Sequence, residues 1–159
     1  MIGPIEVALA ALNEAEVRYL VVGEVAVVLH GYLRTTADLD LWVQLTEDNL
    51  ERATRCLHAL GYRPRAPVRI EEFAVTAKRR EWVSQKGLVV FSLDLFVQDP
   101  FDFDAAYERA LRVPLESTEA RVLGLDDLIA MKQSVGRPHD QEDLEALRAL
   151  RDAQRGDDL

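Results

Sequence analysis

The chain has 159 residues, of which 48% are hydrophobic and 30% are charged, values typical of a soluble globular domain that can bury a core. Its 28 acidic and 19 basic side chains give a formal net charge of −9. That charge disfavours nonspecific binding to nucleic acid or an anionic membrane, although a local basic patch can still bind. The single cysteine, Cys56, excludes an intramolecular disulfide and a cysteine-based zinc site, and we expect it to be a small hydrophobic residue on a helix.

The sequence predicts neither a secretory leader nor a membrane span. The most apolar stretch, 19–29, is well short of the roughly 20 residues that cross a bilayer, and Glu24 interrupts it. We therefore expect a cytoplasmic protein with no membrane partner. Residues 1–155 are expected to form a single domain, followed by a disordered tail at 156–159.

In chain order, apolar spacing and turn residues predict helices alternating with strands, and then a helical end. The predicted helices are 4–15, 24–30, 47–60, 70–85, 102–111, 125–135 and 138–151. The predicted strands and extended pieces are 17–23, 38–44, an irregular 62–69, 87–98, 113–116 and 120–123. Thr46 and Asp102 are expected to be helix N-caps. The pattern is that of an α/β (α+β) domain with a small mixed β-sheet flanked by helices.

Two aspartates, Asp38 and Asp40, lie inside a predicted strand, DLDLWVQ. Because side chains alternate along a strand, both are expected on one face together with Trp42. The later segment SLDLFVQ repeats this pattern and contributes Asp94. If the two strands are neighbours, three carboxylates meet and need a cation, and Mg²⁺ held by carboxylates and substrate phosphates supports displacement at phosphorus. The alternative is that these aspartates lie on a solvent-facing surface of the sheet or are turn residues.

The residues before the aspartates form a recognisable motif. The pattern G-x-x-A-x-x-x-x-G-x-x-R-x-T-x-D-x-D, from Gly23 to Asp40, resembles the first motif of DNA polymerase beta-like nucleotidyltransferases. It is most similar to the small bacterial proteins of the abortive-infection and toxin–antitoxin type. The resemblance implies that Asp38, Asp40 and Asp94 bind the metal ions and carry catalysis. It also implies that Gly23 lies at the turn that holds the triphosphate.

The C-terminal segment LIAMKQSVGRPHDQEDLEAL is similar to the end of the same proteins. By that resemblance, Lys132 contacts the nucleotide phosphates. The residues implied to support the site or to fix the last helix are Arg137, Asp140 and Asp143.

The motif also contains residues that allow two interpretations. Glu24 stands where the family usually has glycine or serine, so it either repels the phosphate or points to solvent from the first turn of a helix, where the dipole favours it. Arg34 either contacts phosphate or substrate, or pairs with an aspartate and ties the turn, and Thr36 is a turn and strand-edge residue. His30 either lines the pocket or lies partly exposed on its helix. Trp42 either stacks a base or packs as an ordinary aromatic residue.

A set of basic side chains stands out in so acidic a sequence. It forms either a solvated face or a groove for RNA or for an acidic partner. The set is Arg63, Arg65, Arg69, Lys78, Arg79 and Arg80.

These observations predict a nucleotidyltransferase-like domain that depends on Mg²⁺ (or Mn²⁺). It would transfer a nucleoside monophosphate from an NTP such as ATP to a hydroxyl of RNA, a protein or a small molecule, releasing pyrophosphate. The resemblance alone implies a role in a toxin–antitoxin or phage-defence system, with a cognate toxin or antitoxin as partner. The alternative is a catalytically impaired binding module of the same fold that acts through a partner protein.

Overall fold

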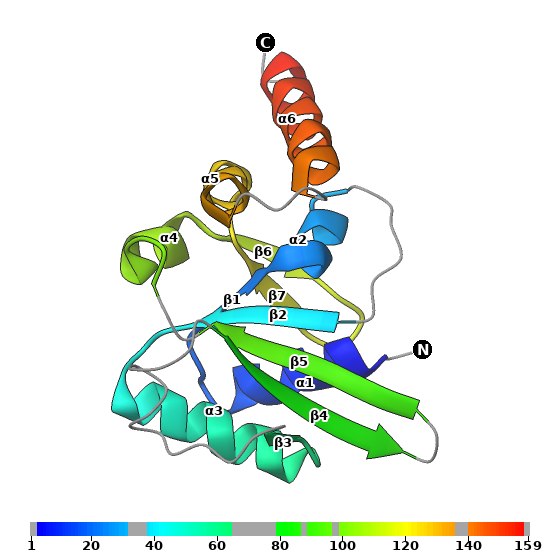
Figure 1. The fold of residues 1–159 in the computed structure, drawn as a ribbon, viewed down its shortest axis with the longest axis vertical. Helices are drawn as coiled ribbons and strands as arrows, with labels where there is room; N and C mark the ends of the chain where they lie inside the picture. The colour runs from blue at the N-terminus through cyan, green and yellow to red at the C-terminus, as the bar shows by residue number, and fades with distance from the viewer. Residues whose placement is uncertain are drawn as a thin grey trace.

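The computed structural model describes residues 3–31, 38–64, 79–86, 89–96, 99–135 and 140–157. Within these ranges the chain alternates between strands and helices (Figure 1). The strands are β1 (Tyr19–Val22), β2 (Asp38–Val43), β3 (Arg63–Pro64), β4 (Arg79–Lys86), β5 (Val89–Phe96), β6 (Leu111–Pro114) and β7 (Glu119–Val122). The helices are α1 (Pro4–Glu14), α2 (Gly23–Leu29), α3 (Glu47–Ala59), α4 (Phe103–Arg109), α5 (Leu125–Val135) and α6 (Asp140–Asp157).

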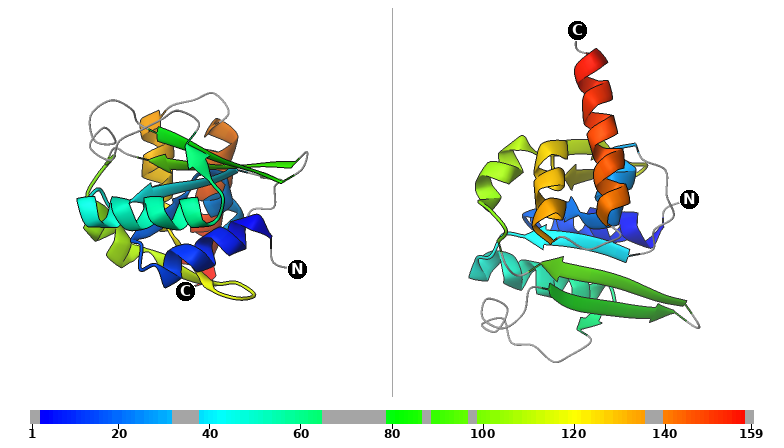
Figure 2. Two further views of the ribbon diagram at one scale, coloured as in Figure 1. Left: turned by 90° about the horizontal axis from the view of Figure 1, so that it is seen from below. Right: turned by 45° about the horizontal axis from the view of Figure 1, so that its top comes forward.

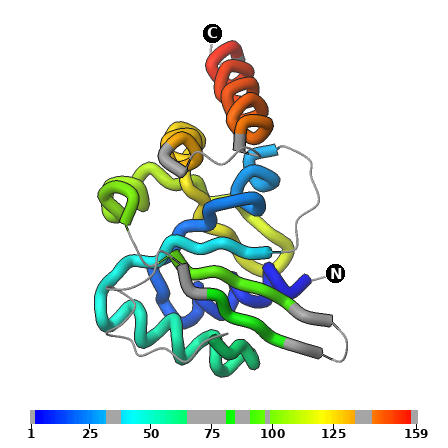
Figure 3. Tube along the Cα trace, in the orientation of Figure 1, coloured from blue at the N-terminus to red at the C-terminus, as the bar shows by residue number. Residues whose placement is uncertain are grey.

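The described strands form one seven-stranded sheet in the order β3-β4-β5-β2-β1-β7-β6. The sheet is mixed, because β2 runs antiparallel to β1 but parallel to β5. Figure 2 shows α1 and α3 on one side of the sheet and α2, α5 and α6 on the other. The Cα trace in Figure 3 shows the last helix projecting beyond the sheet. This architecture confirms the predicted class, a mixed sheet flanked by helices with a helical C-terminal end.

The centre of the sheet forms as the alternation predicts. Leu39 and Leu41 on β2 lie beside Leu93 and Leu95 on β5, and all four side chains are at most 2% exposed. Burying a leucine side chain contributes about 1.5–3 kcal/mol, so these positions hold the two strands in register. The aspartates alternate with the leucines and therefore project from the other face of the sheet.

The expected local features of three segments are confirmed. The side chain of Thr46 accepts a hydrogen bond from the backbone N–H of Asn49 at the start of α3, and that of Asp102 accepts one from Ala105 at the start of α4. Cys56 is buried on α3, and this burial raises the pKa of its thiol. The thiol therefore stays protonated and acts as a small hydrophobic group.

The predicted helix over 70–85 is wrong where the structure describes it. Residues 79–86 form β4, which pairs antiparallel with β5 along its whole length. Trp82 and Ser84 are buried, a period of two that is typical of a strand. Cross-strand pairing with β5 outweighs the weak helical spacing of this segment. The remaining part of the expected helix, 70–78, lies outside the described residues.

Two element boundaries also differ from the prediction. Leu111, which was expected to end a helix, begins β6 because pairing with β7 extends the backbone there. The last helix continues to Asp157, past Arg151, where the apolar spacing predicts its end. None of the helices in the described ranges combines the length and the apolar character that crossing a membrane requires.

Asn49 ties α3 to Arg18, which precedes β1, and to Gln44, which follows β2. Its side chain is fully buried, accepts a hydrogen bond from the Arg18 N–H at 2.8 Å, and donates to the carbonyls of Arg18 and Gln44, both at 2.9 Å. Backbone groups that leave water need partners, and Asn49 supplies them to the Arg18 N–H and to the Gln44 carbonyl. The Arg18 carbonyl also accepts a hydrogen bond from the Gln44 N–H, at 3.1 Å. The Asn49 side chain therefore fixes the N-terminal end of β1 against α3.

We predict that Asn49→Ala destabilises the fold by about 2–4 kcal/mol, because the Arg18 N–H and the Gln44 carbonyl lose this partner together. Urea denaturation followed by circular dichroism measures the change. Arg55→Ala, on the exposed side of the same helix, is the matched control and should change stability by less than about 0.5 kcal/mol. Equal effects of the two substitutions would show that Asn49 has no special role.

Candidate active site

The aspartates of the motif meet the later aspartate through the pairing of β2 with β5. In this parallel pair Asp40 lies beside Asp94, and Asp38 lies beside Ser92. Neighbouring strands are about 4.8 Å apart and paired residues project to the same face, so the carboxylates of Asp40 and Asp94 share one small region of the sheet. Asp38 is exposed at the start of its strand, while Asp40 and Asp94 are half-buried.

A fourth acidic residue extends this row on the next strand. Glu81 on β4 lies opposite Asp94, and its Oε1 accepts a hydrogen bond from the Ser92 hydroxyl at 3.2 Å. Asp40, Asp94 and Glu81 therefore occupy equivalent positions on three adjacent strands, which we call the acidic row. The sequence prediction missed Glu81 because its segment was assigned to a helix. The sequence carries no clear strand signal at this point, because the adjacent apolar residues Trp82 and Val83 break a two-residue alternation.

Gly23 lies directly against this row. It has a φ of 68° at the start of α2, in the left-handed region that favours glycine. A Cβ atom at Gly23 would overlap the carboxylate of Asp40, at 2.9 Å from its Cγ. Because Gly23 has no side chain, the Asp40 carboxylate can occupy this space. Glu24 follows in the first turn of α2 and is half-buried, in the position where the helix dipole favours an acid.

Lys132 and Asp143 form a buried ion pair between the two C-terminal helices. The Lys132 ammonium donates to Asp143 Oδ2 at 3.0 Å, and both side chains are at most 10% exposed. Farther along the same helices, Arg151 lies 3.6 Å from Asp126, so α5 and α6 run antiparallel with an ion pair toward each end. Through this pair Asp143 joins the last helix to α5.

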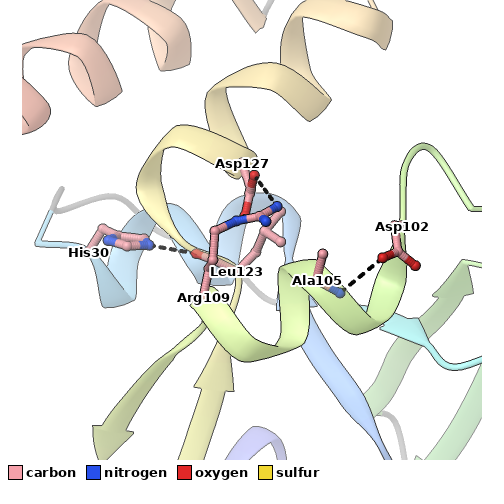
Figure 4. Close-up of polar contacts among 6 residues, drawn as sticks. All are labelled: His30, Asp102, Ala105, Arg109, Leu123 and Asp127. Carbon is pink, nitrogen blue, oxygen red and sulfur yellow. Dashed lines mark hydrogen bonds and ion pairs between the residues drawn. The ribbon is translucent and has the colours of Figure 1, made fainter.

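Two residues near the motif are held by the surrounding structure. His30 is buried, and its Nε2 lies 2.8 Å from the Leu123 carbonyl (Figure 4), so this ring nitrogen carries the hydrogen that it donates. Trp42 is fully buried, donates its indole N–H to Asp99 at 2.9 Å and contacts Phe103 edge to face. Trp42 is therefore a packed aromatic residue, and His30 is a buried one.

Figure 4 also shows how the helix after β5 is fastened to α5. The Arg109 guanidinium donates two hydrogen bonds to the Asp127 carboxylate, at 3.0 and 3.1 Å. This bidentate contact raises the pKa of Arg109, which stays charged. The contact lies on the exposed surface and contributes little to stability by itself.

Some of the expected site residues cannot be placed. Arg34, Thr36 and Arg137 lie outside the described residues. Asp140 begins α6, and only its backbone is described.

The structure describes only part of the set of basic residues between positions 63 and 80. Arg63 lies on β3 with an exposed side chain, and Arg79 and Arg80 belong to β4. The other members, Arg65, Arg69 and Lys78, lie outside the described residues.

The residues of the acidic row fit a divalent cation of a particular kind. Among the described residues, no three acidic, histidine or cysteine side chains are grouped closely enough to hold a metal ion by themselves. Mg²⁺ is commonly bound by one or two carboxylates, with substrate phosphates completing its coordination. The neighbouring carboxylates of Asp40 and Asp94 are such a pair, and the space beside Gly23 accommodates one of them.

The chain belongs to the nucleotidyltransferase family of unknown function (DUF6036), whose sequence profile matches residues 5–153. This confirms the predicted enzyme class, a nucleotidyltransferase. A search of curated protein sequences finds no relative of this chain.

Solved structures of nucleotidyltransferases share the fold. A lincosamide antibiotic adenylyltransferase, LnuA, bound to lincomycin, has a TM-score of 0.65 and 14% identity, with 92% of this chain and 95% of that chain covered. A nucleotidyltransferase from Thermotoga maritima has a TM-score of 0.61 and 18% identity, covering 91% and 93%. The antibiotic-resistance factor ANT(2'')-Ia has a TM-score of 0.59 and 16% identity, covering 96% and 89%. At such identities the likeness extends to the fold alone.

We predict that Gly23→Ala removes nucleotide binding and lowers stability by at least about 1–2 kcal/mol, because the left-handed backbone and the Asp40 carboxylate both exclude a methyl group. Thermal unfolding and nucleotide titration measure the two effects. Gly156→Ala is the matched control, since a Cβ there meets nothing within 4 Å and alanine favours the helix. Full nucleotide binding by Gly23→Ala would contradict the importance of this close approach.

A double-mutant cycle separates the structural role of Lys132 from its expected role toward phosphate. Lys132→Met alone should cost about 3–5 kcal/mol, because it leaves the Asp143 carboxylate buried without its ammonium partner. Combining Lys132→Met with Asp143→Leu should return stability to within about 2 kcal/mol of the wild type. If Lys132 also contacts phosphate, the stable double variant still has weakened nucleotide binding. Restored binding would limit Lys132 to a structural role.

Proposed function

We propose that this nucleotidyltransferase transfers a nucleoside monophosphate from an NTP to a hydroxyl group of a small molecule, using Mg²⁺ or Mn²⁺. The observation that carries the proposal is the parallel register that aligns Asp40 with Asp94, directly against the side-chain-free Gly23. A carboxylate pair beside a close backbone approach can bind a cation that is shared with a triphosphate. The family of the chain supports the reaction class.

Each residue of the site has a specific task in the proposal. Asp40 and Asp94, with Asp38 two residues before Asp40, would hold the metal together with the substrate phosphates, and the metal would supply positive charge to the reacting phosphate and to the leaving pyrophosphate. Asp94 also accepts the proton of the attacking hydroxyl, and Glu81 lies close enough on the neighbouring strand to share this task. Gly23 lets the backbone approach the triphosphate.

The cationic residues would act on the phosphates. Lys132 would add positive charge next to them, and Arg34 would do the same from the motif. Thr36, Arg137, Asp140 and Asp143 would support this arrangement.

A small-molecule acceptor is supported by the proteins that share the fold. LnuA was solved with lincomycin, and ANT(2'')-Ia was solved with adenylyl-2''-tobramycin at a TM-score of 0.53 and 14% identity. Both are covered almost completely by this chain, so an additional acceptor-binding domain is not a requirement of the fold. RNA and protein hydroxyls remain the other acceptors to be tested.

The alternative function is a binding module with impaired catalysis that acts through a partner protein. Glu24 favours it, because an ionised carboxylate next to Gly23 would repel a phosphate. A cognate toxin or antitoxin would be that partner, a proposal that rests on the resemblance of the motif to toxin–antitoxin nucleotidyltransferases.

The two functions differ in their response to nucleotides. We predict that an NTP with Mg²⁺ or Mn²⁺ raises the melting temperature by about 5 °C or more at 100 times its Kd, because the ligand binds only the folded state. Differential scanning fluorimetry with each of the four NTPs, with and without metal, measures the shift. No shift with any of them at millimolar concentration would leave the binding module as the better proposal.

Transfer itself is tested with labelled NTP and three acceptor pools: hydroxyl-rich small molecules, RNA and cell-extract protein. Asp40→Asn should lower transfer at least about 100-fold, because a metal ligand contributes several kcal/mol to the transition state. Glu81→Gln, if Glu81 shares the proton transfer, should lower kcat more than it changes KM. Asp152→Asn, on the exposed side of the last helix, is the charge-matched control and should retain full activity.

A further inference from the structure

A second polar cavity lies away from the acidic row, at the opposite end of β1. Arg18 immediately precedes β1, whereas Val22 at the other end of the strand lies beside Asp40. The cavity has a volume of about 670 Å³ and is lined by residues from the end of α1, from α3, from α4 and from β7. Three arginines converge on it: Arg18, Arg52 and Arg121. We call it the arginine cavity.

The part of the chain that the structure describes gives the three guanidinium groups no close carboxylate partner. Within the described ranges, none of them forms an ion pair, although the chain has 28 acidic residues and 19 basic ones. Glu16 and Glu119 also line the cavity and pair with none of the arginines. The Nε of Arg52 is buried and has no hydrogen-bond partner among the described residues. A buried donor without a partner is unfavourable, and an oxyanion ligand would satisfy it.

Tyr107 on α4 orients two of the arginines. The Arg121 guanidinium carbon lies 4.2 Å from the centre of the Tyr107 ring, and that of Arg18 lies 5.8 Å from it. The Tyr107 ring is itself stacked on Phe103, with ring centres 5.6 Å apart. A cation–π contact of this kind does not use the N–H groups of the guanidinium as hydrogen-bond donors, and a pair of these groups matches the oxygen spacing of a phosphate.

The backbone beneath the arginine cavity is held before any ligand binds. The buried Asn49 fastens the Arg18 backbone to α3, and Arg52 lies one helical turn further along the same helix. Asn13 donates to the Thr118 hydroxyl at 2.9 Å and to the Glu119 carbonyl at 2.7 Å, which joins the end of α1 to the start of β7. The arginines therefore project from segments that are already fixed, which lowers the entropy lost on binding.

We propose that the arginine cavity is a second anion-binding site, which takes the phosphate group of a ligand. Three guanidinium groups without an ion pair among the described residues, one of them with a buried Nε that lacks a hydrogen-bond partner there, form a phosphate-binding set. The phosphate comes either from a free phosphorylated small molecule or from the terminal phosphate of an RNA, since both present the same oxyanion. The site is separate from the acidic row and does not depend on the proposed transfer reaction.

The test measures phosphate binding without nucleotide chemistry. Inorganic phosphate is titrated in EDTA into the full chain carrying Asp40→Asn, with binding followed by ³¹P NMR and isothermal calorimetry. Saturable binding is expected. Arg121→Gln and Arg52→Gln should each weaken it about tenfold or more, the effect of losing a charged hydrogen bond. Arg121→Lys should also weaken phosphate binding, because an ammonium keeps the charge but cannot form the bidentate hydrogen bonds of a guanidinium.

The control is Arg55→Gln, which removes a guanidinium from the exposed side of the same helix as Arg52 and should leave binding unchanged. Melting temperatures verify that each variant is folded. Three ligands identify the source of the phosphate: AMP, a 5'-phosphorylated RNA oligomer, and the same oligomer without its phosphate. If the phosphorylated oligomer binds more tightly than both AMP and the unphosphorylated oligomer, the ligand is RNA. If AMP binds as tightly as the phosphorylated oligomer, or more tightly, the ligand is a small molecule. Absence of saturable phosphate binding at tens of millimolar, or equal weakening by Arg55→Gln, would overturn the proposal.

Discussion

The parallel pairing of β2 with β5 is the constraint on which the rest of the site depends. It buries Leu39 and Leu41 beside Leu93 and Leu95, and a shift of one residue would turn these leucines toward the polar face. The same register that buries the leucines therefore forces Asp40 next to Asp94. Like charges at neighbouring strand positions repel, so hydrophobic burial on one face holds an unfavourable charge arrangement on the other. A cation shared with a triphosphate would relieve that repulsion.

The elements around the pair serve this arrangement in different ways. Gly23 makes room for the Asp40 carboxylate at the start of α2, where any other residue would collide with it. The Lys132–Asp143 ion pair joins α5 to α6 on the same side of the sheet. A buried ion pair favours one geometry more than it adds stability, so its value here is the fixed position of the two helices.

Charge is distributed unevenly along β1. The carboxylates of the acidic row lie beside its C-terminal end, and the arginine cavity surrounds the residue before its first position. In a chain with a net charge of −9, a cluster of arginines that form no ion pair with the described residues is the exception, whereas the acidic row follows the overall composition. The proposed cation site and the proposed anion-binding site therefore lie at opposite ends of the same strand and bind different ligands.

The sequence alone determined the features that depend on local periodicity: the alternation that places Asp38 and Asp40 on one face, the caps at Thr46 and Asp102, and the glycine of the motif. These follow from strand and helix geometry within a few residues. Only the tertiary structure decided that Glu81 joins Asp94 and that arginines from three separate elements share a cavity. Strand pairing and helix packing join residues distant in the chain, and their register depends on burial across the whole sheet, which no short segment encodes.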